Sequence, residues 1–360
     1  MLLGKFHSLP KILYNGSANY RHMIVKGRVQ EREHNLVKLD VKDKKIISLL
    51  SNNSRMPLSE VAKKVMLSRD SISYRIKRLQ ENKVVLRLFP LINYKHFGYN
   101  IFHVFIIADE TNKKEHDGLI SDLYNHPNII SLMEYNDRWD FHISLIAKNI
   151  RDYDRIMTEI TTKYKNVIVE KDISEVIRTY KMSFTPYDSN LKINPNIFEH
   201  KGKTDLDEHD MDILKILTQD ARQSTYEIGQ KIGLNPDTVG YRIKKMIANG
   251  PLMNFTALNN FTAMGYHWYT FVVQMKTFDH KHELKFQAFI KDNPHIIRAV
   301  KTLGVWDVML YVIVNNITEF HMLMKDIKRE FYDIIKHYES WNAYEEHFYN
   351  PIPSAIYNKN

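Results

Sequence analysis

Two short stretches of the sequence combine arginine and lysine with apolar residues at helical spacing. Residues 73–80 read SYRIKRLQ, and residues 240–247 read GYRIKKMI. Guanidinium groups on such a helix can bind phosphates or the O6 and N7 atoms of guanine, and hydroxyl groups can bind bases or the duplex backbone. Double-stranded DNA is therefore a candidate ligand. The alternative that these residues leave open is a helical bundle whose charged face is simply solvated.

The apolar residues of each stretch define which side chains face outward. Ile72, Ile76 and Leu79 are spaced four and three residues apart, so they share the inward face of a helix. Val239, Ile243 and Met246 repeat this spacing in the second stretch. The candidate DNA-binding residues are those at the helix start and on the outward arc: Ser68, Ser71, Ser73, Tyr74, Arg75, Lys77 and Arg78 in the first stretch, and Asn235, Thr238, Tyr241, Arg242, Lys244 and Lys245 in the second.

Both stretches belong to a long internal repeat with a constant offset of 167 residues. A constant offset over nearly 150 residues indicates two copies of one unit, because chance matches or a short-period solenoid would scatter the offsets. The copies span about 38–187 and 205–354. Matching pairs include Leu39 with Leu206, Arg55 with Arg222, Gly98 with Gly265, Pro127 with Pro294, and Trp139 with Trp306.

Three helices are expected at the start of each copy, and the third carries the basic stretch. Asp40 and Asp207 are placed as helix N-caps. Ser68 is a good N-cap for the third helix, and Asn235 followed by Pro236 is a strong helix start in the second copy. A short helix, a tight turn and a basic helix together form a helix-turn-helix, whose last helix is sized to enter a major groove.

The second half of each copy predicts the order β-α-β-β-α-β, which is a ferredoxin-like sandwich. The expected fold class is therefore α+β, with two winged helix-turn-helix domains that are each followed by such a sandwich. We expect winged helix-turn-helix domains at 38–92 and 205–259, sandwich domains at 93–187 and 260–354, a polar linker at 188–204, an extension of unassigned fold at 1–37 and a tail at 355–360.

This arrangement resembles the leucine-responsive regulatory protein (Lrp)/AsnC family of transcription regulators over nearly everything after residue 37. The matching motifs are LDxxD at Leu39 and Leu206, LSRDSISYRIKRL and LNPDTVGYRIKKM at the third helices, and FGYN and MGYH before the first sandwich strand. The resemblance implies a cytoplasmic, non-enzymatic DNA-binding regulator that self-associates through its sandwich (RAM) domains and responds to an amino acid or a related small molecule. Tandem fusion then suggests a pseudo-dimer whose halves are covalently linked.

The resemblance also places an effector loop in each sandwich domain, with a family pattern close to Thr-Gly-x-x-Asp. The second copy keeps Gly304 and Asp307, with Thr302 one place early, whereas the first copy keeps Asp140 and lacks the glycine. These four residues are the effector-binding candidates, and the pocket of the first copy is expected to be altered or lost. The alternative for both aspartates is a turn acid at a strand start.

Charge differs between the two helix-turn-helix modules. Residues 38–90 contain 13 Lys or Arg and 5 Asp or Glu, a net charge of +8, whereas residues 205–257 contain 6 and 8, a net charge of −2. Phosphate neutralisation supplies most non-specific affinity for DNA, so the first module is expected to be the main electrostatic anchor. Pro251 cannot donate to a strand ladder, which predicts a distorted second wing.

Composition limits the other classes of function. The chain of 360 residues has a formal net charge of +9 and no cysteine. The absence of cysteine excludes disulfides, cysteine–zinc sites and cysteine-ligated iron–sulfur clusters, and it fits a reducing cytosol. No stretch approaches 18 uncharged apolar residues, so no membrane span is expected. No catalytic motif stands out, and neither a cofactor nor a metal is expected.

Two alternative functions stay open from the sequence. Siroheme decarboxylases resemble this family and some are fused pairs; an enzyme of that kind would use sandwich-domain histidines such as His103, His142 and His267. A lone histidine on a strand is more often structural or solvated. The second alternative is a ligand-sensing protein with weakened DNA binding. The net charge of −2 on the second helix-turn-helix module favours this alternative.

Overall fold

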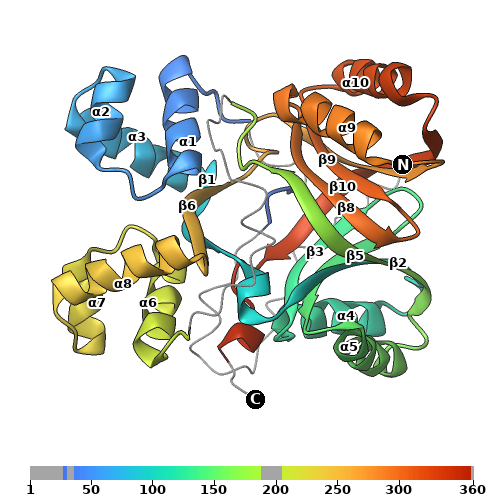
Figure 1. Cartoon of the computed structure of the whole chain (residues 1–360), viewed down its shortest axis with the longest axis horizontal. Helices are drawn as coiled ribbons and strands as arrows, with labels where there is room; N and C mark the ends of the chain where they lie inside the picture. The colour runs from blue at the N-terminus through green and yellow to red at the C-terminus, as the bar shows by residue number, and fades with distance from the viewer. Residues whose placement is uncertain (1–26, 31–35, 188–204, 358–360) are drawn as a thin grey trace, which may run out of the picture.

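Two helical modules lie on one side of the molecule and a β-barrel lies on the other (Figure 1). The computed structural model describes residues 27–30, 36–187 and 205–357. The expected linker at 188–204, and most of the 1–37 extension, lie outside the described residues. The expectation of an α+β chain with two helix-turn-helix units, each followed by a sheet domain, is confirmed.

The helices of the two modules begin at the residues that the local sequence favours. Asp40 and Asp207 each form a capping box with the aspartate three residues later, so both predicted N-caps are confirmed. The Ser68 side chain accepts a hydrogen bond from the Ser71 amide, and Asn235 accepts one from the Asp237 amide. The helices are α1 (Val41–Asn52), α2 (Leu58–Val65) and α3 (Arg69–Glu81) in the first module, and α6 (Glu208–Gln219), α7 (Thr225–Ile232) and α8 (Pro236–Asn249) in the second.

The strand that follows each third helix pairs with its counterpart in the other module. β1 (Val85–Ile92) and β6 (Leu252–Asn259) form an antiparallel two-stranded ribbon. β6 has the same length as β1, and Pro251 precedes the ladder, where its carbonyl accepts from the Asn93 amide. The expected distortion of the second wing is limited to a register shift at the start of β6, where Leu252 and Asn254 pair with consecutive residues of β1.

The ribbon brings the two modules into one hydrophobic core. Helix α1 packs on β6, and helix α6 packs on β1. Ile46 and Leu50 of α1 and Ile213 and Leu217 of α6 are fully buried in a single cluster with Phe89 of β1. The modules therefore share apolar burial, which is the dominant favourable term in folding.

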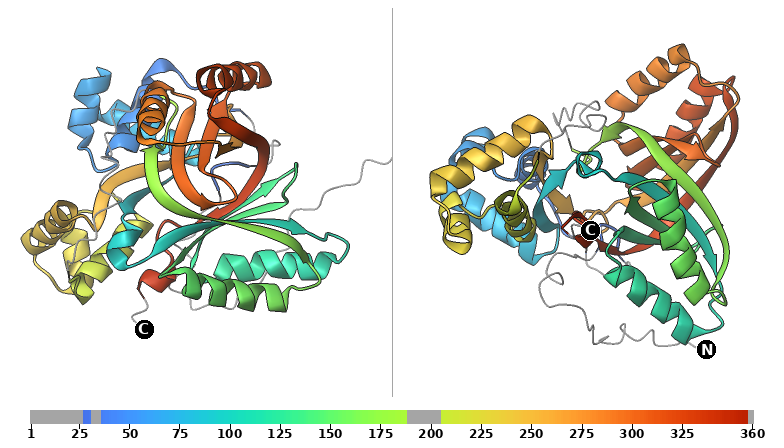
Figure 2. Two further views of the ribbon diagram at one scale, coloured as in Figure 1. Left: turned by 45° about the vertical axis from the view of Figure 1, so that its right-hand side comes forward. Right: turned by 60° about the horizontal axis from the view of Figure 1, so that its bottom comes forward.

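Each sheet domain has the strand order of a ferredoxin-like sandwich. The first has the order β3-β4-β2-β5 and the second has the order β10-β7-β9-β8. Figure 2 shows that the long helices lie on the outer faces of the sheets. The first domain contains β2 (Asn100–Ala108), α4 (Lys113–Asn125), β3 (Ile129–Tyr135), β4 (Phe141–Ala147), α5 (Ile150–Lys163) and β5 (Ile168–Met182); the second contains β7 (His267–Met275), α9 (His280–Asp292), β8 (Ile296–Gly304), β9 (Val308–Val314), α10 (Ile317–Phe331) and β10 (Ile335–Tyr349).

The two sheets join edge to edge into one closed barrel. β5 pairs antiparallel with β8, and β10 pairs antiparallel with β3, so both edges of each four-stranded sheet are covered. The interior contains Trp139, Trp306 and Trp341, all buried. A short 3₁₀ turn at Tyr94–Phe97 lies between β1 and β2, and another at Ser354–Ile356 follows β10.

A short part of the N-terminal extension is built into this architecture. The Gly27 amide donates to the Glu346 carbonyl, and the Glu346 amide donates to the Val29 carbonyl. The Phe261 amide donates to the Arg28 carbonyl. Residues 27–30 therefore lie beside β10 at the junction of the barrel and the second module.

Among the described residues, no helix is long and apolar enough to cross a membrane, and no group of three or more His, Asp or Glu side chains is arranged to hold a metal ion.

Candidate DNA-binding surface

Helices α3 and α8 each present a tyrosine and a lysine to solvent. Tyr74 is 67% exposed and Tyr241 is 66% exposed. Lys77 and Lys244 are exposed one turn further along. The apolar stripe predicted for these helices is buried, so the outward arc of both helices lies where the sequence places it.

The two arginines of the arc have partners within their own modules. Arg75 Nη1 lies 2.8 Å from Asp40 Oδ2 and 2.7 Å from Asp43 Oδ1. Arg242 repeats this with Asp207 at 2.8 Å and Asp210 at 2.9 Å. The hydrogen bonds that Arg75 donates to the Asp40 and Asp43 carboxylates raise its pKa. These arginines therefore link α3 to the start of α1, and α8 to the start of α6.

The remaining candidates divide into capping groups and open groups. The Ser68 and Ser71 hydroxyls lie 2.9 Å apart at the start of α3, and Arg78 Nη2 lies 2.5 Å from Asp43 Oδ2. Lys77 has a loose partner, Glu81, at 3.7 Å. Apart from the capping residues Ser68 and Asn235, the exposed candidates that no acidic side chain engages in the described structure are Ser73, Tyr74, Thr238, Tyr241, Lys244 and Lys245.

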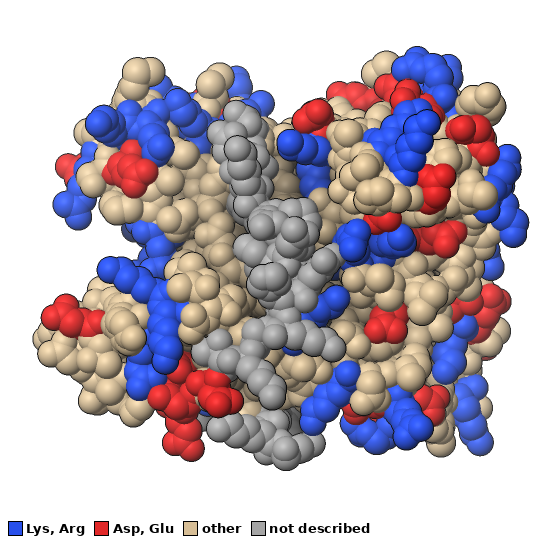
Figure 3. Space-filling view, in the orientation of Figure 1, with Lys and Arg blue, Asp and Glu red and all other residues tan. Residues whose placement is uncertain are grey.

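The surface charge of the modules is uneven. Figure 3 shows Lys and Arg side chains spread over the first module, whereas the second carries a basic band and a cluster of Asp and Glu at its lower edge. The same view shows a notch between the modules. This distribution follows the net charges of +8 and −2 in the matched windows of sequence.

The predicted effector residues have hydrogen-bond partners within the barrel. Asp140 Oδ2 accepts from the Ala108 amide at 2.6 Å, and Asp307 Oδ2 accepts from the equivalent Met275 amide at 2.7 Å. The Thr302 hydroxyl donates to the Trp306 carbonyl. Both carboxylates thus tie a turn to the neighbouring strand, and effector binding at these residues stays a prediction.

Gly304 lies where two strands approach closely. Its φ is +153°, and a Cβ atom there would lie 2.3 Å from the Ile173 carbonyl oxygen of β5. The equivalent residue of the first copy, Asp137, instead accepts a hydrogen bond from the Asn342 amide of β10. Because these contacts join β8 to β5 and β3 to β10, the loops contribute to closure of the barrel.

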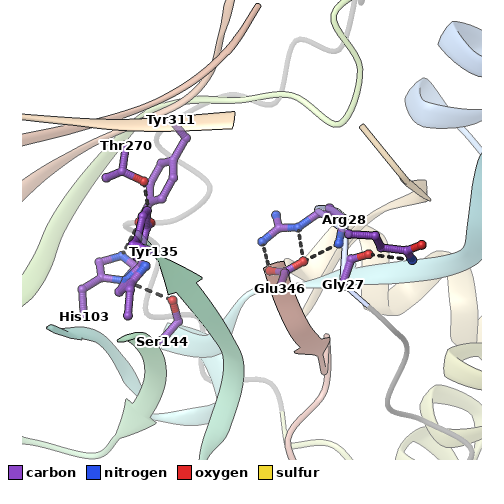
Figure 4. Close-up of polar contacts among 10 residues, drawn as sticks. Gly27, Arg28, His103, Tyr135, Ser144, Thr270, Tyr311 and Glu346 are labelled. Carbon is purple, nitrogen blue, oxygen red and sulfur yellow. Dashed lines mark hydrogen bonds and ion pairs between the residues drawn. The ribbon is translucent and has the colours of Figure 1, made fainter. Parts of the chain in front are cut away.

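A histidine pair lies inside the barrel. His142 Nε2 and His103 Nδ1 are 2.8 Å apart, and the Ser144 hydroxyl is 3.1 Å from His103. Figure 4 shows His103 and Ser144 beside Tyr311, Tyr135 and Thr270. Burial lowers the pKa of His142 to about 3, and it lowers the pKa of His103 well below its ordinary value. Both imidazoles are therefore neutral at neutral pH.

A buried ion pair of the N-terminal segment was not found by the sequence reasoning. Arg28 Nε lies 3.0 Å from Glu346 Oε2, and its Nη2 lies 2.5 Å from Oε1 (Figure 4). The guanidinium group also stacks over the rings of Trp268 and Tyr349. Residues 27–30 have no counterpart in the repeat, so no comparison between the copies could identify this pair.

The chain matches the AsnC-type helix-turn-helix domain twice, at residues 39–80 and 206–247. It is 30% identical over 119 residues to the HTH-type transcriptional regulator FL11 of Pyrococcus furiosus, which covers 33% of this chain and 78% of the regulator. It is 25% identical over 143 residues to the HTH-type transcriptional regulator Ptr1 of Methanocaldococcus jannaschii, which covers 40% of this chain and 95% of that regulator.

Among solved structures, the siroheme decarboxylase NirDL superposes with a TM-score of 0.58 over 85% of this chain and 92% of its own, at 12% identity. At that identity the likeness shows the fold alone. The two domain matches and the similarity to FL11 agree with the exposed basic arcs of α3 and α8. This chain therefore belongs to the Lrp/AsnC family of DNA-binding transcription regulators.

Proposed function

We propose that the chain binds specific DNA sequences as an intrachain pseudo-dimer, in which α3 and α8 each read one half-site. The observation that carries this proposal is the reciprocal assembly of the modules: β1 pairs with β6, α1 packs on β6 and α6 packs on β1. A single chain thereby presents two recognition helices in one fixed relation. Half-sites read in neighbouring major grooves are separated by about 10 bp or a multiple of it.

The two half-sites are dissimilar in this proposal. The first module supplies most of the phosphate neutralisation, because its net charge is +8 against −2 for the second. Tyr74 and Lys77 of α3 and Tyr241 and Lys244 of α8 are exposed and form the central contacts of the proposed interface. Arg75 and Arg242 orient the two helices through their aspartate pairs, and they reach DNA only from the flank of the arc.

The test is binding of the full chain to duplexes selected from a random pool, followed by fluorescence anisotropy at several salt concentrations. Lys77→Ala is expected to weaken binding and to reduce the slope of log affinity against log salt by about 1. Lys244→Ala is expected to have a smaller effect, and Lys325→Ala on the distant helix α10 is the control. If Lys77→Ala and Lys244→Ala reduced DNA affinity equally at palindromic half-sites, the proposed difference between the two modules would be refuted. Absence of binding to any duplex at low salt would refute the function.

Two finer features belong to the same proposal. An amino acid or related small molecule acts as the effector, with Thr302, Gly304, Asp307 and Asp140 as its candidate contacts. Chains also associate further through their sheet domains, which sedimentation would measure. The domain limits at 38–92, 93–187, 205–259 and 260–354 are proposed on the same basis.

The alternative function, a siroheme decarboxylase, predicts that the chain binds siroheme. Its supporting observation is the two-copy architecture shared with NirDL. Against it, His103 and His142 are buried and bonded to each other, and a decarboxylase has no need for an exposed basic α3. A new absorbance band on adding siroheme to the purified chain would favour the enzyme.

A further inference from the structure

A cavity lies where the β1–β6 ribbon meets the barrel. Its volume is about 60 Å³, several times the roughly 10–15 Å³ that one water molecule requires. Leu91 and Ile92 of β1 form one wall, and strands of both sheet domains form the other. Much of the lining is apolar, including Phe89, Ile101, Val176 and Met182. The space therefore suits a small molecule with an apolar part.

Arg298 of β8 brings a positive charge to this cavity without a carboxylate partner. Its Nε atom is buried and makes no hydrogen bond, and its guanidinium group lies 5.4 Å from the ring of Tyr311. Within the described residues no Asp or Glu lies at ion-pair distance from it. The other arginine of the wall, Arg28, is neutralised by Glu346. Arg298 is half-buried, and a guanidinium group that has no carboxylate partner beside a mostly apolar wall can bind an anion through charge-assisted hydrogen bonds.

Further polar groups of the wall can bind the same anion. The Ser131 side chain is buried and lines the cavity, so its hydroxyl can donate to an anion there. Lys95 lies on the rim, where its Nζ donates to the Ile177 carbonyl at 3.3 Å. Burial is the main cause of the lowered pKa of His142 and His103, and the charge of Arg298 lowers both further.

The internal repeat gives rise to two related cavities, and within the described residues only one of them is lined by an unpaired arginine. The residue equivalent to Arg298 in the first copy is Ser131, so the guanidinium group occurs once. A second cavity, of about 580 Å³, is lined by Trp268, Ala343 and Tyr344, the equivalents of Ile101, Val176 and Ile177. Its described lining contains no Lys or Arg. An anion would therefore select the cavity with Arg298.

We propose that this cavity binds a small monocarboxylate with a short apolar chain. The carboxylate lies against Arg298 and the Ser131 hydroxyl, and the chain packs against Phe89 and Val176. One unpaired guanidinium group matches one negative charge, and the apolar walls disfavour a doubly charged phosphate.

Binding here would couple to DNA recognition, a consequence that rests on the proposed function. The cavity is lined by both the ribbon that carries the modules and the barrel. A ligand that fills it therefore changes how the ribbon sits on the barrel, and with it the placement of α3 and α8. Binding of the ligand itself does not depend on DNA, so the two ideas can fail separately.

The experiment is titration calorimetry of the full chain with isovalerate, with the neutral isovaleramide, and with inorganic phosphate. Isovalerate is expected to bind, and isovaleramide at least tenfold more weakly. Arg298→Ser, which copies the residue at position 131, is expected to reduce isovalerate affinity at least tenfold, and Arg298→Lys less. Arg329→Ser, in exposed helix α10, is the matched control and is expected to bind normally.

The opposite results would overturn the proposal. These are no binding of isovalerate, equal binding of the amide, preferential binding of phosphate, or undiminished binding by an Arg298→Ser chain whose circular dichroism is unchanged. If Arg298→Ser does not fold, the proposal is tested by comparing the affinities of isovalerate and isovaleramide for the natural chain. A change in DNA affinity on adding isovalerate then tests the coupling; its absence would refute only the coupling.

Discussion

Arg55 and Arg222 each donate hydrogen bonds to backbone carbonyls of the other's module. Arg55 Nη1 donates to Ala221 and Gln223, and Arg222 donates through Nη1 to Ser54 and through Nη2 to Met56. The two arginines occupy equivalent positions of the repeat. Burial lowers the pKa of both groups, and the charge of Arg222 lowers that of Arg55 further. The pair fixes one module against the other despite this repulsion.

Replacing Arg55 with alanine is expected to loosen this junction. The variant loses two charge-assisted hydrogen bonds, so the free energy of unfolding should fall by about 2 kcal/mol. Arg222→Ala should have a similar effect, because its contacts are reciprocal. Thermal unfolding followed by circular dichroism measures the loss, with exposed Arg329→Ala as the control. Unchanged stability in both variants would show that the modules are positioned by the ribbon and the apolar core alone.

The Arg28–Glu346 pair predicts a different pattern. Arg28→Met leaves the fully buried Glu346 carboxylate unpaired, and a loss of about 3–5 kcal/mol is expected. The double variant Arg28→Met with Glu346→Thr, which takes the residue found at the equivalent position 179, should recover much of that loss. Denaturant unfolding of the three chains measures this. A double variant as unstable as Arg28→Met would show that the burial of residues 27–30, and not the charge pair, is what stabilises the chain.

Local features of the fold were predictable, and contacts between distant residues were not. Asp40 and Asp43 lie three residues apart, so the capping box can be read from a short stretch of sequence. The pairing of β1 with β6 joins residues more than 150 positions apart, and no local pattern encodes it. The same limit applies to the candidate site: the outward arc of α3 followed from helical spacing, whereas the contact of Arg75 with Asp40 joins separate helices. The one sequence feature that pointed to this contact is that both residues recur in the second copy, as Arg242 and Asp207.

Substitution of Gly304 tests whether its loop has a structural role or binds an effector. Gly304→Ala places a Cβ atom 2.3 Å from the Ile173 carbonyl, so we expect a loss of about 1–3 kcal/mol in the absence of any effector. Asp137→Ala, at the equivalent position, loses only its hydrogen bond to the Asn342 amide and should cost about 1 kcal/mol. Thermal midpoints of both variants give the comparison. If Gly304→Ala unfolds like the natural chain and differs only when an amino acid is added, the glycine serves the effector and not the strand contact.

The buried histidine pair predicts a loss of stability in mild acid. Unfolded imidazoles titrate near pH 6.5, whereas the pKa of His142 is lowered to about 3 and that of His103 is also well below normal. Unfolding therefore takes up protons once the pH falls below about 6.5. His142 makes no difference to stability above about pH 7, and its protonation in the unfolded chain costs about 1.4 kcal/mol per pH unit below 6.5, or about 2 kcal/mol at pH 5. His103 acts in the same direction.

The second copy supplies the variants that test this pH dependence. Thr270 and Met309 occupy the positions equivalent to His103 and His142, so His103→Thr with His142→Met replaces the pair with residues that the related sheet already accommodates. The thermal midpoint of this double variant should fall less between pH 7 and pH 5 than that of the natural chain, whereas exposed His321→Gln should leave the natural slope unchanged. Parallel profiles for all three chains would mean that the carboxylates, and not the buried imidazoles, set the acid sensitivity. A flatter profile for the double variant would show that the two buried imidazoles set the acid sensitivity of the natural chain.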